Sequence, residues 1–121
     1  MRQSFDRELE RLQSEVLRMG SEVEEHLTKV IDAFLARDMY TSRQMIDADV
    51  SINERRIQLG LGSLTLIATQ QPMARDMRLI AAIMEIVGEL ERIHDYIKGI
   101  GKISLNLGEA PVLPAMAASM P

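Results

Sequence analysis

Apolar residues recur every three or four positions along most of this chain of 121 residues. In the first segment, from about Phe5 to Arg37, the spacings between successive stripe residues are 4, 3, 4, 3, 4, 4, 3 and 4. Their mean is close to the 3.6 residues of an α-helical turn. Such a helix is roughly 50 Å long at ~1.5 Å per residue, and it needs partners along its whole apolar stripe. The pattern therefore predicts a bundle of long helices.

Two further segments continue the helical pattern. The first break falls around 37–41, where Asp38 or Thr41 is suited to cap the next helix. The second break falls at Pro72, because proline lacks the amide donor and disfavours helical angles in the residue before it. Three long helices joined by short turns predict an all-α fold, an antiparallel three-helix bundle over residues 1–108.

Residues 109–121 contain three of the four prolines and are predicted to form a Pro/Ala-rich tail. Glycines lie inside the second helix and near the end of the third, where Gly99 and Gly101 indicate a fraying end. The core-facing stripe predicted for the second helix comprises Ile46, Val50, Ile57, Leu61, Leu64 and Ala68. The main stripe predicted for the third helix comprises Ile83, Ile86, Leu90, Ile93, Ile97, Ile100 and Leu107.

Composition excludes several classes of function. The net charge of −4 and the absence of a basic face argue against nucleic-acid binding. There is no cysteine for a disulfide or a thiolate, and no Ser/His/Asp arrangement stands out, so we expect no enzyme. No apolar run reaches the ~20 residues of a transmembrane helix, and the charged N-terminus has no secretory signal. The expected location is the cytoplasm.

Two pairs of polar residues are not needed for the bundle. Asp49 and Asn53 lie four apart on the second helix, and Glu91 and Asp95 lie four apart on the third. Residues at this spacing share a helix face, and two carboxylates can bind a hard cation. Each pair is 19 to 23 residues from Pro72, so antiparallel helices bring the two pairs to the same height. We therefore predict a metal site at these four residues, to which the neighbouring His94 could add a nitrogen ligand.

The third helix also has a second uncharged face, formed by Met77, Ala81, Met84 and Gly88. A helix that is apolar on two sides normally lies between two surfaces. One side can face its own bundle, and the other is predicted to contact a second copy of the chain in a homodimer.

Motifs spread over about five-sixths of the chain resemble the first half of the PhoU family of phosphate-transport regulators. They are Phe5-Asp6-Arg7-Glu8-Leu9, Met19-Gly20, Ile46 to Asn53, Gln70 to Arg78, and Leu90-Glu91-Arg92-Ile93-His94-Asp95. The resemblance implies a three-helix repeat that is usually present twice, and multinuclear metal clusters on paired (Glu/Asp)-x-x-x-Asp motifs. The matching positions are Glu91 with Asp95 and Asp49 with Asn53, and the metal is left open among iron, zinc, manganese and magnesium.

The same resemblance implies a regulatory role. Family members restrain phosphate uptake and signalling through contacts with a phosphate ABC transporter and a membrane-bound sensor kinase, so membrane association is expected only through these partners. This chain departs from the family in having one repeat, and residues 109–121 then read as the shortened start of a second. It also has His94 where the family usually has glycine, and Asn53 where an acid would bind metal more strongly.

Two other interpretations are open at this point. A ferritin-like metal-binding or metalloenzyme bundle uses Glu-x-x-His motifs, and Glu91-x-x-His94 matches once. A helical oligomerisation module without metal would need only the second apolar face of the third helix.

Overall fold

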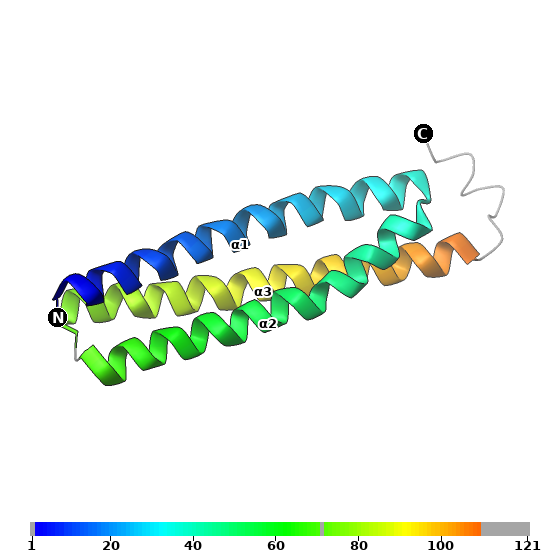
Figure 1. Cartoon of the computed structure of the whole chain (residues 1–121). Helices are drawn as coiled ribbons and strands as arrows, with labels where there is room; N and C mark the ends of the chain where they lie inside the picture. Colours follow the sequence, from blue (N-terminus) through cyan, green and yellow to red (C-terminus); the bar gives the residue numbers. More distant parts are fainter. Residues whose placement is uncertain (1, 71, 110–121) are drawn as a thin grey trace.

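The computed structural model describes residues 2–70 and 72–109, which form three long helices and no strand. Helix α1 spans Arg2–Ala36, α2 spans Met39–Gln70 and α3 spans Ala74–Glu109. Figure 1 shows the three helices side by side, with the start of α1 and the α2–α3 turn at one end and the α1–α2 turn at the other. Every pair of helices is in contact. The predicted all-α antiparallel three-helix bundle is confirmed, and the predicted tail, except Glu109, lies outside the described residues.

The turn between α1 and α2 is closed by local hydrogen bonds. Arg37 adopts a left-handed conformation (φ 55°), and the amide of Asp38 donates to the Ala33 carbonyl at 2.8 Å. The Asp38 carboxylate accepts hydrogen bonds from the amide and hydroxyl of Thr41, at 3.0 and 2.7 Å, and these bonds lower its pKa. Asp38 is therefore the N-cap of α2. The Arg37 guanidinium donates to the Leu107 carbonyl at 2.8 Å and holds the end of α3 against this turn.

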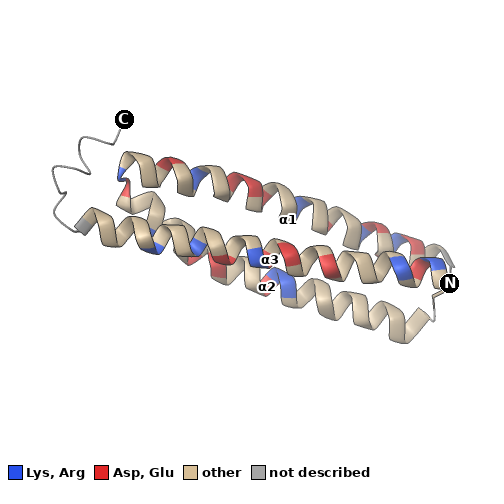
Figure 2. Cartoon of the chain, turned by 180° about the vertical axis from the view of Figure 1, so that it is seen from behind, with Lys and Arg blue, Asp and Glu red and all other residues tan. Residues whose placement is uncertain are grey.

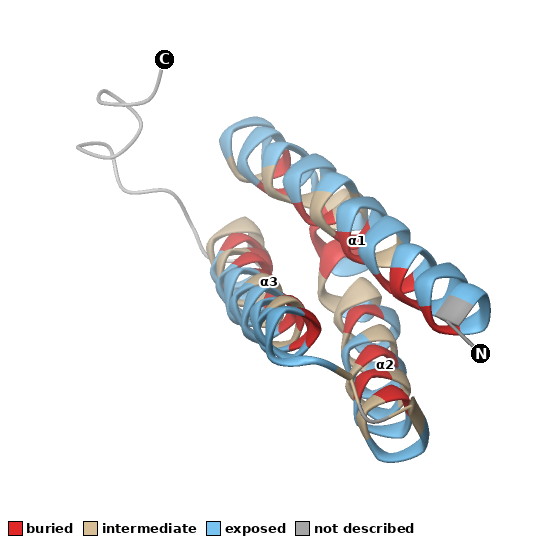
Figure 3. Cartoon of the chain, turned by 90° about the vertical axis from the view of Figure 1, so that its left-hand side faces the viewer, coloured by how far each residue is buried: buried red, intermediate tan, exposed pale blue. Residues whose placement is uncertain are grey.

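The core is formed by residues that recur every seven positions along each helix. Figure 3, which looks along the bundle, shows the buried residues gathered where the three helices face one another. Burying each large aliphatic side chain stabilises the fold by about 1.5–3 kcal/mol. The main series are Leu12 and Met19 with Val16, Val23 and Val30 on α1; Met45, Ile52, Leu59 and Leu66 on α2; and Ile80 and Val87 with Ile83 and Ile97 on α3.

The stripe predicted for the second helix is wrong. Val50 is 64% exposed and Leu61 is 60% exposed, whereas Ile52 is fully buried. The true core series is interrupted by the small and polar residues of the neighbouring series, which contains Ser42, Asp49 and Ser63. The outer side of α2 carries more large apolar residues than its inner side, so apolar periodicity alone selects the wrong face.

The stripe predicted for the third helix is partly right. Ile83, Leu90, Ile97 and Ile100 contribute to the core, but Ile86 is 49% exposed on the α1 side. A shallow apolar pocket of about 280 Å³ lies further along this α1–α3 groove, lined by Ile31, Phe34, Ile100 and Ile103. No helix in the described part of the chain has the length and apolar character needed to cross a membrane.

Candidate functional site

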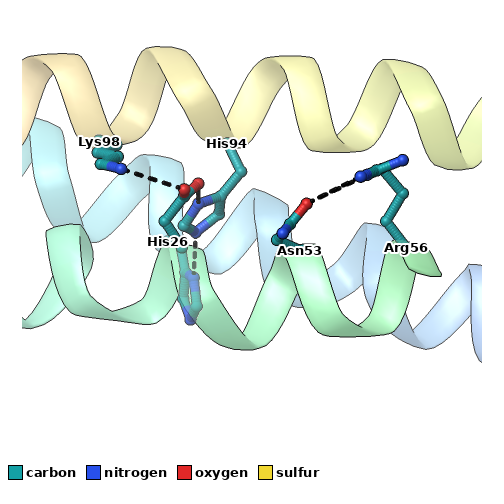
Figure 4. A network of polar contacts seen from close by, with 6 residues as sticks. His26, Asn53, Arg56, His94 and Lys98 are labelled. Carbon is teal, nitrogen blue, oxygen red and sulfur yellow. Dashed lines mark hydrogen bonds and ion pairs between the residues drawn. The ribbon is translucent and has the colours of Figure 1, made fainter. Parts of the chain in front are cut away.

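A chain of polar side chains crosses the core at mid-height and joins all three helices (Figure 4). His26 Nδ1 on α1 lies 2.9 Å from His94 Nε2 on α3, and the two rings meet edge to face at 66°. His94 Nδ1 lies 3.0 Å from Asp49 Oδ1 on α2. The other carboxylate oxygen of Asp49 lies 3.5 Å from Lys98 Nζ on α3. His94 has no exposed surface, His26 is half-buried, and only the Lys98 end is otherwise open to solvent.

The carboxylate of Asp49 determines the direction of these hydrogen bonds. An ionised carboxylate only accepts, so Nδ1 of His94 carries the proton and donates to Asp49 Oδ1. In neutral His94 the Nε2 lone pair then faces His26 and accepts a hydrogen bond from His26 Nδ1. All three buried polar groups are thereby satisfied, as a core of this polarity requires.

Sequence reasoning missed His26 and treated His94 as a neighbour of the acidic pair. A signal was nevertheless present in the core series. His26 lies seven residues after Met19 in the α1 series, and His94 lies seven residues after Val87 in the α3 series. A histidine at a heptad core position on each of two helices is a stronger indication of an internal polar contact than either residue alone.

The register predicted for α2 and α3 is supported by the contacts of Asp49. Asp49 lies 23 residues before Pro72, and its partners His94 and Lys98 lie 22 and 26 residues after it. The segments that carry the two predicted metal-binding pairs are therefore at the same height. Asp49 is more deeply placed than predicted, since its side chain is only 14% exposed.

The four predicted metal ligands are not assembled around one point. Asp49 is engaged with His94 and Lys98, and the Asn53 oxygen accepts two hydrogen bonds from Arg56, at 3.2 and 3.1 Å. Figure 4 shows Asn53 directed toward Arg56 and away from the histidines. Glu91 is half-buried and Asp95 exposed. Among the residues that the structure describes, no three His, Cys, Asp or Glu side chains are grouped closely enough to hold a metal ion.

Burial lowers the pKa of His26 from its usual value, and the charge of His94 lowers it further, with a smaller contribution from Lys29. The carboxylates of Glu22 and Glu25 oppose this shift. The folded protein therefore binds a proton at His26 less readily than the unfolded chain, whose histidine pKa is about 6.5.

We expect the unfolding temperature to fall as the pH decreases through about 6.5 and on toward the lowered pKa of His26, because the unfolded state takes up the proton first. Above pH 7 the curve should be flat. Thermal unfolding followed by circular dichroism between pH 8 and pH 5 measures this. In His26→Gln the decrease should be smaller than in the wild type, and equal curves for the two proteins would contradict the assignment.

Comparison with known proteins identifies the family. Residues 16–104 match the model of the PhoU domain. The "Phosphate-specific transport system accessory protein PhoU" of Edwardsiella tarda is 36% identical over 101 residues, which are 84% of this chain and 42% of that protein. A homologue from Synechocystis sp. is 32% identical over 95% of this chain and 51% of its own length. One from Streptococcus pneumoniae is 34% identical over 94% of this chain and 53% of its own length.

The chain thus spans about half the length of the relatives it matches. The matched region contains the whole polar network, from His26 on α1 to Lys98 on α3. A ferritin-like bundle is no longer a competing interpretation of the fold, because the domain match and the relatives agree. The chain belongs to the PhoU family.

Proposed function

We propose that this protein is a regulatory accessory component of phosphate-specific transport, which acts in the cytoplasm through protein contacts and not as an enzyme. The observation that carries the proposal is its similarity, over most of its length, to relatives named as accessory proteins of that transport system. The partners we propose are a phosphate ABC transporter and its sensor kinase.

The proposed role can be tested in a bacterium that lacks its own PhoU-family gene. Expression of this chain should restore control of phosphate uptake, measured with radiolabelled phosphate in phosphate-rich medium. A chain with Ile52→Asp, which disrupts the core, serves as the folding control. Uptake that is the same with the wild-type chain as with an empty vector would contradict the proposal.

The surface we propose for contacts lies over the groove between α2 and α3. Met77, Met84, Glu91 and Lys98 are seven residues apart, and Lys98 contacts Asp49 of α2, so this whole line of α3 borders α2. On the other side of the groove, the exposed Val50, Ile57, Leu61 and Leu64 follow the edge of α2. Figure 2 shows that α2 carries no Lys, Arg, Asp or Glu over its final half, next to the α2–α3 turn. An apolar face of this length is typical of an interaction surface.

We propose that a second copy of the chain covers this face in a homodimer. Ala81→Arg should then shift the protein toward monomer, because Ala81 is exposed on the uncharged face of α3 and a buried arginine would have no partner there. Sedimentation velocity or light scattering measures the change. Ala36→Arg, at an exposed alanine at the end of α1, is the matched control and should leave the mass unchanged. A wild-type protein that stays monomeric at high concentration would contradict the homodimer.

We also propose that Glu91 and Asp95 bind a metal cation, with Asp49 and Asn53 as the second half of the site. Carboxylate and amide oxygens at one height on two helices are the donors that hard cations take. In the described conformation these residues do not fit a cation, because Lys98 and His94 engage Asp49 and Arg56 engages Asn53. The acidic pair on α3 is accordingly the part of the site that we expect to bind first.

A bound cation should raise the unfolding temperature by mass action, because it binds the folded chain and relieves repulsion between the two acids. The double change Glu91→Gln and Asp95→Asn should abolish this rise and leave the helical content intact. Differential scanning calorimetry with iron, zinc, manganese and magnesium checks it. If the double variant responds to these metals as the wild type does, the acidic pair is not the site.

A further inference from the structure

We infer that the two facing histidines, His26 and His94, form a second metal site that selects a nitrogen-preferring transition metal such as zinc. This inference does not rest on the proposed function, because it uses neither the acidic pair of α3 nor the apolar face. The first observation is geometric: His26 Nδ1 and His94 Nε2 come from different helices and point at the same place, 2.9 Å apart.

The distance between these nitrogens is close to that of two histidines on one metal ion. Two Zn–N bonds of about 2.0–2.1 Å at a tetrahedral angle place the nitrogens about 3.3 Å apart. Moving from the observed separation to this one requires a ring shift of less than about half an ångström, which a half-buried side chain such as His26 can provide. The metal would lie where the two rings now share a proton.

The second observation is the contact on the far side of His94. Histidines that bind metal almost always donate the other ring N–H to a carboxylate, which fixes the tautomer and increases the basicity of the ligating nitrogen. His94 Nδ1 donates to Asp49 Oδ1 at 3.0 Å, and this leaves the Nε2 lone pair directed at the site. Asp49 is held in turn by Lys98, so the orienting carboxylate is itself fixed.

The third observation concerns charge and access. Burial favours the neutral form of His26, which is the form that binds metal. Neutral His26 needs only to move its proton from Nδ1 to Nε2, so no net proton is released at this residue. His26 is half-buried and gives the site a route to solvent, and water can complete the coordination. Glu22 lies one turn before His26 on α1, where its negative charge favours a cation.

The choice of residues in the core supports the same conclusion. At both positions the neighbouring members of the heptad series are apolar: Met19 and Ala33 flank His26, and Val87 precedes His94. A single internal hydrogen bond contributes only about 1 kcal/mol, less than burial of a large aliphatic side chain contributes. The histidine pair is therefore a poor choice for stability alone, and metal binding gives it a function.

The test uses the full chain without a histidine tag, treated with chelator and titrated with Zn²⁺ by calorimetry. We expect one site that His26→Gln abolishes and that Asp49→Asn weakens about 10- to 100-fold, as the loss of an orienting carboxylate does elsewhere. The double variant Glu91→Gln and Asp95→Asn is the control that separates this site from the acidic pair, and it should keep the affinity. Mg²⁺ should not compete, because magnesium requires oxygen ligands.

A second measurement reports on the ring nitrogens directly. In ¹⁵N NMR of the imidazoles, Zn²⁺ should shift His26 Nδ1 and His94 Nε2 and leave His94 Nδ1 protonated. Zinc binding that is unchanged in His26→Gln would overturn the inference, as would imidazole signals that do not respond to zinc in the wild type. In either case the pair is only a hydrogen bond within the core.

Discussion

His94→Ala should destabilise the protein by about 2–4 kcal/mol, one of the two largest effects that we expect from a single substitution. The side chain is fully buried, so its removal leaves a cavity at the level where all three helices meet. It also leaves Asp49 Oδ1 without its donor inside the bundle. Urea unfolding followed by circular dichroism measures the loss.

Tyr96→Ala, two residues further along α3, is the control for that measurement. Tyr96 is 66% exposed, so its removal should change the free energy of unfolding by no more than about 0.5 kcal/mol. Equal losses for the two substitutions would show that His94 does not have the buried, bonded position described here.

A double-mutant cycle separates the polar contact from packing. His94→Leu fills most of the space but leaves the partly buried Asp49 carboxylate with only Lys98. Asp49→Leu likewise leaves His94 Nδ1 without an acceptor. Because unpaired buried polar groups are costly, each single change should destabilise, and the double change should recover much of that loss. Additive effects in the cycle would indicate that the 3.0 Å contact contributes little.

The fold could be predicted from the sequence because its signals are local. Apolar spacing close to a helical turn, the Asp38 cap and the break at Pro72 each act within a few residues, and the observed helices end within a few residues of the predicted bounds. The pairing of heights between α2 and α3 also followed, since a short turn between antiparallel helices fixes it.

The inner face of α2 could not be predicted in the same way. Its core series places Asp49 and two serines beside the buried aliphatic residues, whereas its outer edge carries Val50, Leu61 and Leu64. Ranking faces by apolar content assumes that every apolar surface is covered by the chain itself. That assumption fails for a helix with one face in its own core and another face exposed on the bundle.

The candidate site was predicted in place but not in composition. The sequence indicated the correct level of the bundle through Asp49 and Glu91, yet the side chain that organises this level is His94. The contact between His26 and His94 spans 68 positions, so no local pattern reports it. Only the shared seven-residue periodicity of two helices, read together, could have shown that both histidines point inward.

Gly101→Ala should destabilise the protein by about 1–3 kcal/mol, although alanine is the better helix former. The sequence suggested a fraying end at this residue, but α3 continues to Glu109, and Gly101 is buried against α2. A Cβ atom there would lie 2.9 Å from Ile46 Cγ1 and 3.0 Å from the backbone oxygen of Ser42. The backbone oxygen cannot move aside as a flexible side chain can, so α2 and α3 would have to separate near the buried hydrogen bond between the hydroxyls of Ser42 and Ser104, which are 2.8 Å apart.

Gly99→Ala, two residues earlier on the same helix, is the matched control for Gly101→Ala. A Cβ atom at Gly99 meets nothing within 4 Å, so only the helix propensity changes, and the variant should be stabilised by about 0.5–1 kcal/mol. The same substitution is therefore expected to have opposite signs at two neighbouring positions. Thermal and urea unfolding of the two variants decide the matter: if Gly101→Ala is as stable as Gly99→Ala, α2 and α3 do not approach as closely at Gly101 as the structure places them.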